Sequence, residues 1–182
     1  MAFILGKKSK MTQIWKDGKI LPVTEVIAVP NQIKILRNKE KDGYEAVQLL
    51  IGKKSREFRV ENLNDFKIGD LVGVSVFKEG EVVNVSGLTK GRGFQGVVKR
   101  HGFSGGPKTR GQKNRHRAPG SIGNTSPQRV IPGRRMAGHM GNVRVTASGL
   151  KIVAIDSEKN ILMLKGAVPG YKGSLVEIKT RK

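Results

Sequence analysis

Residues 11–20 decide the fold class, and they read Met11-Thr12-Gln13-Ile14-Trp15-Lys16-Asp17-Gly18-Lys19-Ile20. The pair Asp17-Gly18 lies between two apolar runs, Met11–Trp15 and Ile20–Val29. Such a pair is typical of a two-residue hairpin turn, because its central residues adopt a positive φ. The sequence therefore predicts an antiparallel β-hairpin near the start of a mainly β protein.

Further short strands are predicted along the chain on the basis of alternating apolar residues and polar turns. Many short strands joined by short turns are typical of a closed barrel or a sandwich, and no long amphipathic helix is visible. Helical turns are predicted only at Asn62–Phe66 and Gln95–Arg100. The further predicted strands are Gln32–Leu36, Tyr44–Ile51, Leu71–Phe77, Glu81–Val85, Lys151–Ile155, Ile161–Leu164 and Leu175–Thr180.

The charge of the chain is unevenly distributed. Its 182 residues hold 35 Lys and Arg against 14 Asp and Glu, a formal net charge of +21. From Val82 to Ile155 there is no Asp or Glu, whereas this stretch holds 14 Lys and Arg and all three histidines. A solvated surface normally mixes both signs because unopposed like charges repel. We therefore expect this stretch to contact a polyanion, most often nucleic acid.

Composition excludes several classes of protein. The absence of cysteine excludes disulfides, thiolate metal sites and a cysteine nucleophile. No apolar run approaches the roughly 18 residues of a membrane span. The short run Ala2–Leu5, followed by lysines, does not have the pattern of a secretory signal. We expect a cytoplasmic protein with no membrane partner.

The stretch from Thr89 to Val143 differs from its flanks, because Gly or Pro recurs every few residues and apolar side chains are sparse. A loop of about 55 residues is uncommon in a compact domain unless it is functional or ordered by a partner. This stretch is unable to bury enough apolar surface to order itself. We predict a β domain made of residues 1–88 and 144–182, interrupted by a basic RNA-binding extension, residues 89–143, that is Gly- and Arg-rich and largely irregular.

Two motifs in this stretch have alternative interpretations. Gly91–Gly96 matches GxGxxG, but a dinucleotide site needs a βαβ unit and an acidic residue about twenty positions later, and the sequence offers neither. These glycines are better suited to bring backbone N–H groups close to phosphates. The spacing of His101, His116 and His139, with no carboxylate nearby, argues against a metal site and against a Ser–His–acid triad.

The arginine content indicates how a nucleic acid would be recognised. Arg forms bidentate contacts with phosphates and stacks on bases. Phe94 and Phe103 are the only aromatic residues of the stretch, so shape and backbone recognition of folded RNA is expected to dominate over stacking. If the protein neutralises roughly ten phosphates, the logarithm of its binding constant should fall with the logarithm of the salt concentration with a slope of about −7 to −9. The candidate RNA-binding residues are Lys90, Arg92, Lys99, Arg100, Lys108, Arg110, Lys113, Arg115, His116, Arg117, Arg129, Arg134, Arg135, His139 and Arg144.

Several runs of residues together resemble the universal family of large-subunit ribosomal proteins L three, in its bacterial form. The resemblance extends in order over nearly the whole chain. The runs that carry it are Gly6–Lys8, Met11–Trp15, Asp42–Leu49, Phe77, Asn84–Arg100, His101–Pro107, His116–Gly123, Arg135–Gly141 and Lys165–Gly170.

The resemblance implies a six-stranded barrel of the kind found in translation factors, with a long extension. It also implies direct binding to large-subunit ribosomal RNA early in assembly, and an extension that runs toward the peptidyl transferase centre. The tip of the extension would be Gly123, Asn124, Thr125, Ser126 and Pro127. The implied protein neighbours are other ribosomal proteins, in bacteria L fourteen and L nineteen.

Two other functions stay open from the residues alone. An RNA-modifying or nucleotide-using enzyme would rely on His116 or His139, although the stretch offers them no acidic partner. A general RNA chaperone would show no preference for one region of ribosomal RNA. The resemblance favours a structural protein, so we expect no catalytic residue, no cofactor and no metal.

Overall fold

The computed structural model describes residues 2–16 and 18–181. The chain divides into two compact units. The first, which we call the ring unit, comprises the chain up to Lys90 and from Val143 onward. The second, the inserted unit, is Gly91–Asn142.

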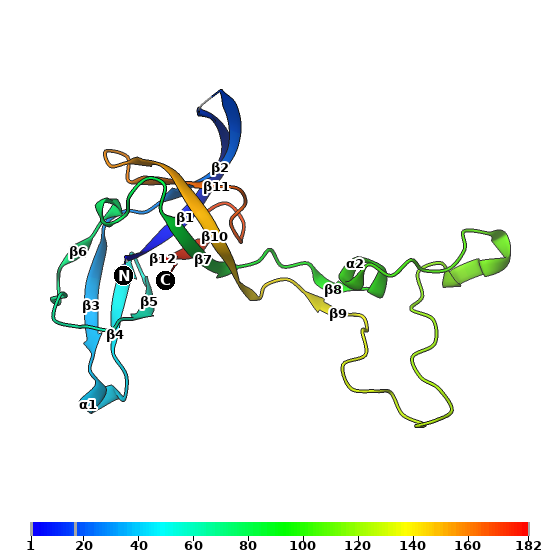
Figure 1. The fold of residues 1–182 in the computed structure, drawn as a ribbon. Coiled ribbons are helices and arrows are strands. Elements are labelled where there is room, and N and C mark those ends of the chain that lie inside the picture. Colours follow the sequence, from blue (N-terminus) through cyan, green and yellow to red (C-terminus); the bar gives the residue numbers. More distant parts are fainter. Residues whose placement is uncertain (1, 17, 182) are drawn as a thin grey trace. The chain divides into compact units, whose positions relative to one another are not determined.

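Six antiparallel strands of the ring unit form a closed ring (Figure 1). Around the ring the order is β1 (Phe3–Lys16), β12 (Leu175–Thr180), β7 (Val82–Leu88), β10 (Arg144–Asp156), β11 (Ile161–Lys165) and β2 (Lys19–Ile27). The ring closes because β2 pairs with β1 as well as with β11. The prediction of a mainly β fold is thus confirmed, but β1 and β10, with 14 and 13 residues, are much longer than the strands predicted at Met11–Trp15 and Lys151–Ile155.

The hairpin predicted from residues 11–20 joins β1 to β2. Trp15 faces Ile20 and Lys16 faces Lys19 across the two strands, which leaves two residues for the turn. Gly18 has a φ of 69°, the left-handed conformation that this turn requires. Asp17, the other residue of the predicted turn, lies outside the described residues.

A second, four-stranded sheet has the order β5 (Lys54–Arg59), β4 (Ala46–Ile51), β3 (Asn31–Arg37) and β6 (Leu71–Val72). A short helix, α1 (Lys39–Asp42), connects β3 to β4 and ends at Gly43 in the left-handed conformation. At Asn62–Phe66, where a helical turn is predicted, the chain forms one hydrogen-bonded turn, from Phe66 N to Leu63 O, but no helix.

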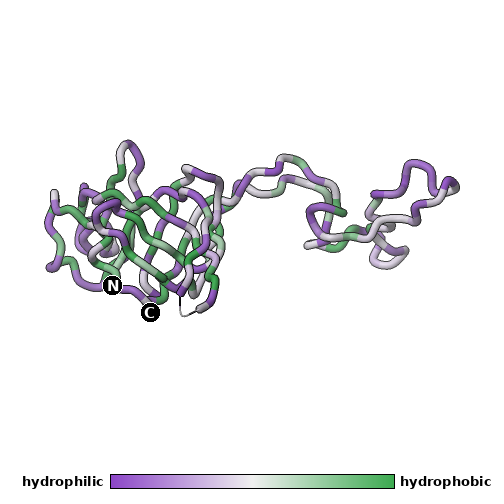
Figure 2. Tube along the Cα trace, turned by 90° about the horizontal axis from the view of Figure 1, so that it is seen from above, coloured by the Kyte–Doolittle hydropathy of each residue, from purple (hydrophilic) through white to green (hydrophobic). Residues whose placement is uncertain are grey.

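Strand β1 supplies residues to two hydrophobic cores, because alternate side chains point to opposite faces of a strand. Ile4 packs in the ring core with residues such as Val85 and Ile178. Its neighbours Phe3 and Leu5 pack in a second core against β3, β4 and β5. All three side chains are buried. In Figure 2 the apolar residues, in green, are concentrated along the strands of the ring unit.

The segment Leu71–Phe77, predicted as one strand, is only partly a strand. Residues 71 and 72 form β6, and Val74–Val76 form a 3-10 helix, η1. The reason is packing: Val74 and Phe77 are both buried in the ring core, and their spacing of three residues matches one turn of a 3-10 helix. The alternation of Val74, Ser75 and Val76 favours a strand locally, but the packing of Val74 and Phe77 in the core determines the structure.

The inserted unit holds four short elements: β8 (Gly93–Gln95), α2 (Val97–His101), the 3-10 helix η2 (Arg110–Arg115) and β9 (Gly138–Met140). Strand β8 pairs with β9, with Phe94 facing His139. The helical turn predicted at Gln95–Arg100 corresponds to α2, shifted by one or two residues. Among the residues that the structure describes, no helix is long and apolar enough to cross a membrane.

Candidate nucleic-acid interface

The inserted unit has almost no interior. Val97 is its only buried residue, and every residue from 117 to 137 is exposed. One buried valine is worth only about 1.5–3 kcal/mol of hydrophobic stabilisation. Ordering about 50 residues costs on the order of 1 kcal/mol or more for each of them. Hydrophobic burial within this unit therefore does not account for a fixed shape.

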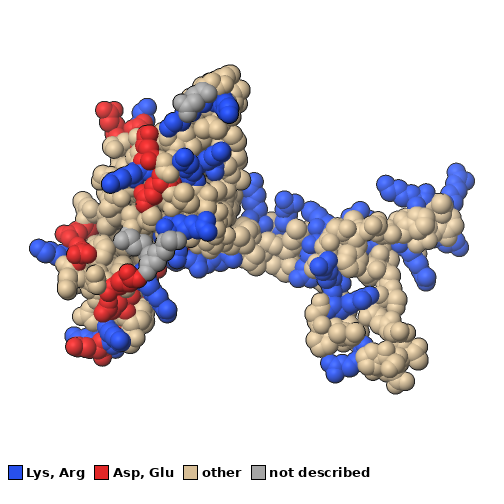
Figure 3. Space-filling model, viewed as in Figure 1, with Lys and Arg blue, Asp and Glu red and all other residues tan. Residues whose placement is uncertain are grey.

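Among Lys, Arg, Asp and Glu, the inserted unit carries only cations, drawn in blue in Figure 3. It carries eleven Lys and Arg residues, three His and no Asp or Glu. The acidic side chains drawn in red in Figure 3 all belong to the ring unit. Of the residues predicted to bind RNA, Arg100 and His116 are half-buried, and the exposed ones are Lys90, Arg92, Lys99, Lys108, Arg110, Lys113, Arg115, Arg117, Arg129, Arg134, Arg135, His139 and Arg144.

The helix α2 is anchored to the segment that precedes β9. Arg100 Nη1 lies 2.7 Å from the carbonyl oxygen of Met136, and His101 Nε2 lies 3.0 Å from the same oxygen. Lys99, Arg100 and His101 form the last turn of α2, where positive charge is favourable to the helix. Arg100 thus has a structural hydrogen bond in addition to donors that are free to bind a ligand.

The predicted tip, residues 123–127, lies in a fully exposed turn. Ser121 Oγ donates to the carbonyl oxygen of Gly123 over 2.8 Å, and Arg134 Nη2 donates to the carbonyl oxygen of Ser121 over 2.5 Å. Asn124 Oδ1 accepts from the backbone N–H of Thr125. Of these hydrogen bonds, only the one from Arg134 to Ser121 joins the two limbs that flank the tip.

Arg144 differs from the other predicted site residues because it forms an ion pair. Its Nη2 donates to Oε2 of Glu177, and the other oxygen of that carboxylate lies 3.1 Å from Nε of Arg56. The carboxylate of Glu177 is only 13% exposed and links strands β10 and β12 to β5. The positive charge of Arg144 is therefore partly neutralised within the protein.

Sequence reasoning missed Lys8, which lies in the ring unit. Its Nζ donates to the carbonyl oxygens of Val168 and Gly170, over 2.7 and 3.0 Å. Burial, and after it the positive charge of Lys90, lower the pKa of Lys8 from its ordinary value. The resemblance motif around residues 6–8 was the only sequence signal for this position, and it gave the residue no role.

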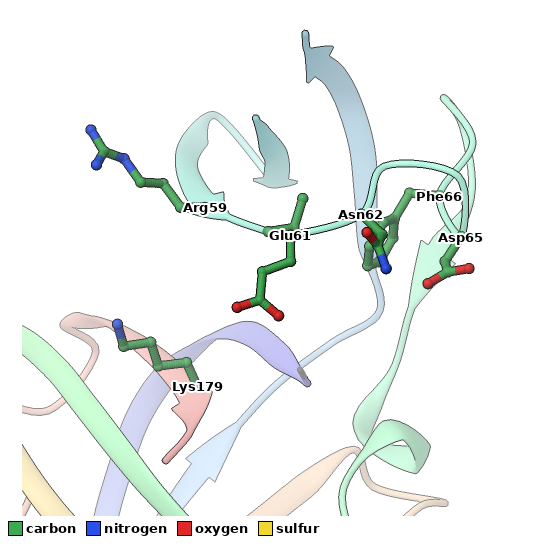
Figure 4. Close-up of a pocket in the computed structure, with 7 residues that line it drawn as sticks. Arg59, Glu61, Asn62, Asp65, Phe66 and Lys179 are labelled. Atoms are coloured by element: carbon green, nitrogen blue, oxygen red, sulfur yellow. The ribbon is translucent and has the colours of Figure 1, made fainter. Parts of the chain in front are cut away.

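A pocket of a different kind lies in the ring unit (Figure 4). It has a volume of about 400 Å³, and cations and carboxylates both line it: Arg59 and Lys179 on one hand, Glu61 and Asp65 on the other. Figure 4 shows Lys179, on β12, across the pocket from Glu61, which follows β5. The carboxylates make this pocket a poor site for a phosphate.

The three histidines do not form a metal centre. Across residues 2–16 and 18–181, no three His, Cys, Asp or Glu side chains come together in a way that could hold a metal ion. His139 faces Phe94 in the β8–β9 pair, His101 contacts Met136, and His116 contacts Pro107.

A closed ring of antiparallel strands carrying an acid-free insertion is an arrangement that suits a protein of a large ribonucleoprotein particle. Comparison with known proteins identifies the family. The family described as Ribosomal protein L3 matches residues 22–160. The chain belongs to this family.

Curated relatives extend the match to nearly the whole chain. The large ribosomal subunit protein uL3 of Herpetosiphon aurantiacus is 48% identical over 199 residues, which cover 96% of this chain and 94% of the relative. The protein of the same name from Dehalococcoides mccartyi is 48% identical over 197 residues, covering 97% and 96%. That of Prochlorococcus marinus is 47% identical over 204 residues, covering 98% and 93%. The resemblance stated from the sequence is thus confirmed.

Proposed function

We propose that this protein is a structural constituent of the large ribosomal subunit, and that its inserted unit binds large-subunit ribosomal RNA directly through phosphates. Of the fifteen residues named above that we propose bind RNA, thirteen lie in the inserted unit, and Lys90 and Arg144 lie in the ring unit, next to it in sequence. Family membership supports a place in the ribosome of a bacterial cytoplasm and a structural, non-enzymatic role. In this proposal the six-stranded ring is a barrel of the translation-protein type.

One observation carries the proposal: a unit with eleven cations, no carboxylate and a single buried side chain. Neither hydrophobic packing nor internal ion pairs can stabilise such a unit, so its charges need an external partner. RNA phosphates supply that partner, since each neutralised phosphate releases a counterion and gains a charge-assisted hydrogen bond. Outside its own hydrogen-bonded parts, which include the β8–β9 pair and the contact of Gly106 with His116, the inserted unit therefore gains its order on the RNA.

We extend the proposal with what the resemblance to this family implies. The protein binds early in assembly, before the RNA around it is fully compact, because a segment that must be enclosed by RNA has to be in place first. The exposed tip at residues 123–127 reaches toward the peptidyl transferase centre. The ring unit contacts neighbouring ribosomal proteins, which in bacteria are L fourteen and L nineteen.

The test is the salt dependence of binding between the full-length protein and large-subunit ribosomal RNA. We expect a log–log slope of about −7 to −9. The triple variant Lys108→Gln, Arg129→Gln and Arg135→Gln should reduce the size of the slope by about 2–3. The matched triple variant Lys34→Gln, Lys53→Gln and Lys67→Gln, in exposed positions of the ring unit, should leave the slope nearly unchanged.

Two results would overturn the proposal. Equal loss of slope in both triple variants would show that the whole surface, and not the inserted unit, neutralises the RNA. Equal affinity for an unrelated RNA of the same length would favour the alternative of a general RNA chaperone.

A further inference from the structure

The segment from Ser104 to Arg117, which we call the 104–117 loop, closes on itself at two glycines. The backbone N–H of Gly106 donates to the carbonyl oxygen of His116 over 2.9 Å. Gly105 has a φ of 77°, and a Cβ atom at this position would lie 2.3 Å from the same carbonyl oxygen. Only glycine allows the two limbs of the loop to approach so closely. The loop is therefore built by its own backbone, unlike the tip of the inserted unit.

The imidazole of His116 is fixed in this loop. Its Nδ1 lies 2.9 Å from the carbonyl oxygen of Pro107. A carbonyl oxygen can only accept, so Nδ1 carries the hydrogen of this bond. The ring orientation is thereby set, and Nε2 is the ring atom left to interact with a ligand.

A cavity of about 510 Å³ opens beside this loop. Three cations line it, Lys108, Arg110 and Arg117, together with the hydroxyls of Ser104 and Thr109. The half-buried Val98 and His116 contribute an apolar side chain and an aromatic ring. No carboxylate lines this cavity, in contrast to the pocket of Figure 4.

We propose that this cavity binds a single unpaired nucleotide of RNA. The three cations and the hydroxyls bind its phosphate, and its base packs against Val98 and the ring of His116. A cavity of this size with convergent polar groups is typical of a small-ligand site, whereas phosphates along a helix need only an open cationic surface. Packing against His116 and Val98 needs the face of a base, and base faces are stacked on one another within an RNA helix, so the nucleotide must lie in a loop or a bulge.

This inference rests on the proposed function and adds a specific subsite to it. The test uses full-length protein and NMR of the three histidine side chains, with adenosine 5′-monophosphate, adenosine and inorganic phosphate as separate probes. We expect the monophosphate to shift the His116 signals in a saturable way, with smaller shifts for phosphate or adenosine alone. The signals of His101 and His139 serve as internal controls and should shift little.

Matched variants separate the subsite from general charge. Arg110→Gln and Arg117→Gln should each weaken binding of the monophosphate about tenfold, the effect of losing one charge-assisted contact. Arg129→Gln removes the same charge outside the cavity and should weaken binding less than twofold. Equal losses in the three variants, equal shifts of all three histidines, or binding of inorganic phosphate as tight as that of the monophosphate would each overturn the inference.

The experiments distinguish a failure of this subsite from a failure of the proposed function. If Arg110→Gln and Arg129→Gln lower the salt slope of ribosomal RNA binding equally while the monophosphate does not affect His116, the subsite is refuted and phosphate binding by the inserted unit stands.

Discussion

The side chain of Asn31 hydrogen-bonds both backbone groups of Leu5: its Oδ1 accepts from Leu5 N over 2.6 Å, and its Nδ2 donates to Leu5 O over 3.2 Å. The pairing of β1 with β2 begins at Lys7 and Ile27, so Leu5 lies just beyond that ladder. The buried side-chain amide of Asn31 thus satisfies both backbone groups of Leu5, as a neighbouring strand would.

Replacing Asn31 by Ala should destabilise the protein strongly. Both backbone groups of Leu5 would lose a partner while buried, and we expect a loss of about 3 kcal/mol in the free energy of unfolding. Urea titration followed by circular dichroism measures it. The exposed Asn124 provides the control, since Asn124→Ala should change stability by less than about 0.5 kcal/mol. Similar values for the two variants would contradict the role of Asn31.

Replacing Glu177 by Gln should strengthen the salt dependence of RNA binding. Arg144 and Arg56 lose their carboxylate partner, so Arg144 can neutralise a phosphate fully, and the size of the log–log slope should rise by about 0.7–0.9. Filter binding over a salt series measures the slope. Glu158→Gln is the control, because it removes the same charge from a carboxylate that forms no ion pair with any described residue. An unchanged slope in Glu177→Gln would exclude Arg144 from the interface.

The pKa of Lys8 should respond to Lys90. Lys90→Gln removes the weaker of the two causes that lower the pKa of Lys8, so this pKa should rise toward its ordinary value but stay below it, because burial remains. NMR of the Lys8 side chain as a function of pH measures the change. Lys54→Gln, in the four-stranded sheet, should leave the pKa unchanged. A pKa that falls or stays constant in Lys90→Gln would show that the two lysines do not interact.

The same shift predicts how stability depends on pH. The pKa of Lys8 is lower in the folded protein than in the unfolded chain, so the unfolded chain binds more protons between the two values. The contribution of Lys8 to stability should therefore rise with pH from the lowered pKa up to 10.5, the value of the unfolded chain. Comparing the pH dependence of unfolding in the wild type and in Lys8→Met isolates this contribution. A contribution that falls over this range would contradict the assignment.

Replacing Gly105 by Ala should disrupt the 104–117 loop without affecting the ring unit. The new Cβ would meet the His116 carbonyl at 2.3 Å and would also force a positive φ on alanine. We expect the amide of Gly106 to lose its protection from hydrogen exchange, while the strands of the ring keep theirs. Gly120→Ala is a close control, since Gly120 also has a positive φ, of 85°, but its Cβ would meet no atom within 4 Å. Equal effects at Gly106 in both variants would contradict the importance of the close approach.

Alternating and turn residues were enough to predict a part of each strand of the ring, because each carries some apolar pattern, but the first half of β1 and of β10 was missed. Strand β5 was missed because Phe58 is its only buried residue, and the strand depends on pairing with β4. The inserted unit could be located from the sequence because it lies within the stretch that has no Asp or Glu. The pairing of Arg144 with Glu177, however, joins residues 33 positions apart and arises only when β10 and β12 enter the same ring. The cavity beside the 104–117 loop likewise depends on a close approach between two limbs that no local pattern encodes.

The ring also constrains the order of events during synthesis. Strand β1 pairs with β12, from Phe3 with Lys179 to Lys7 with Leu175, so during synthesis β1 waits for residues more than 160 positions later. The cationic insertion emerges between these two strands and is complete while the first unit is still open. A nascent chain can therefore meet its polyanion before its own β-structure has closed, and we expect slow closure typical of non-local pairing.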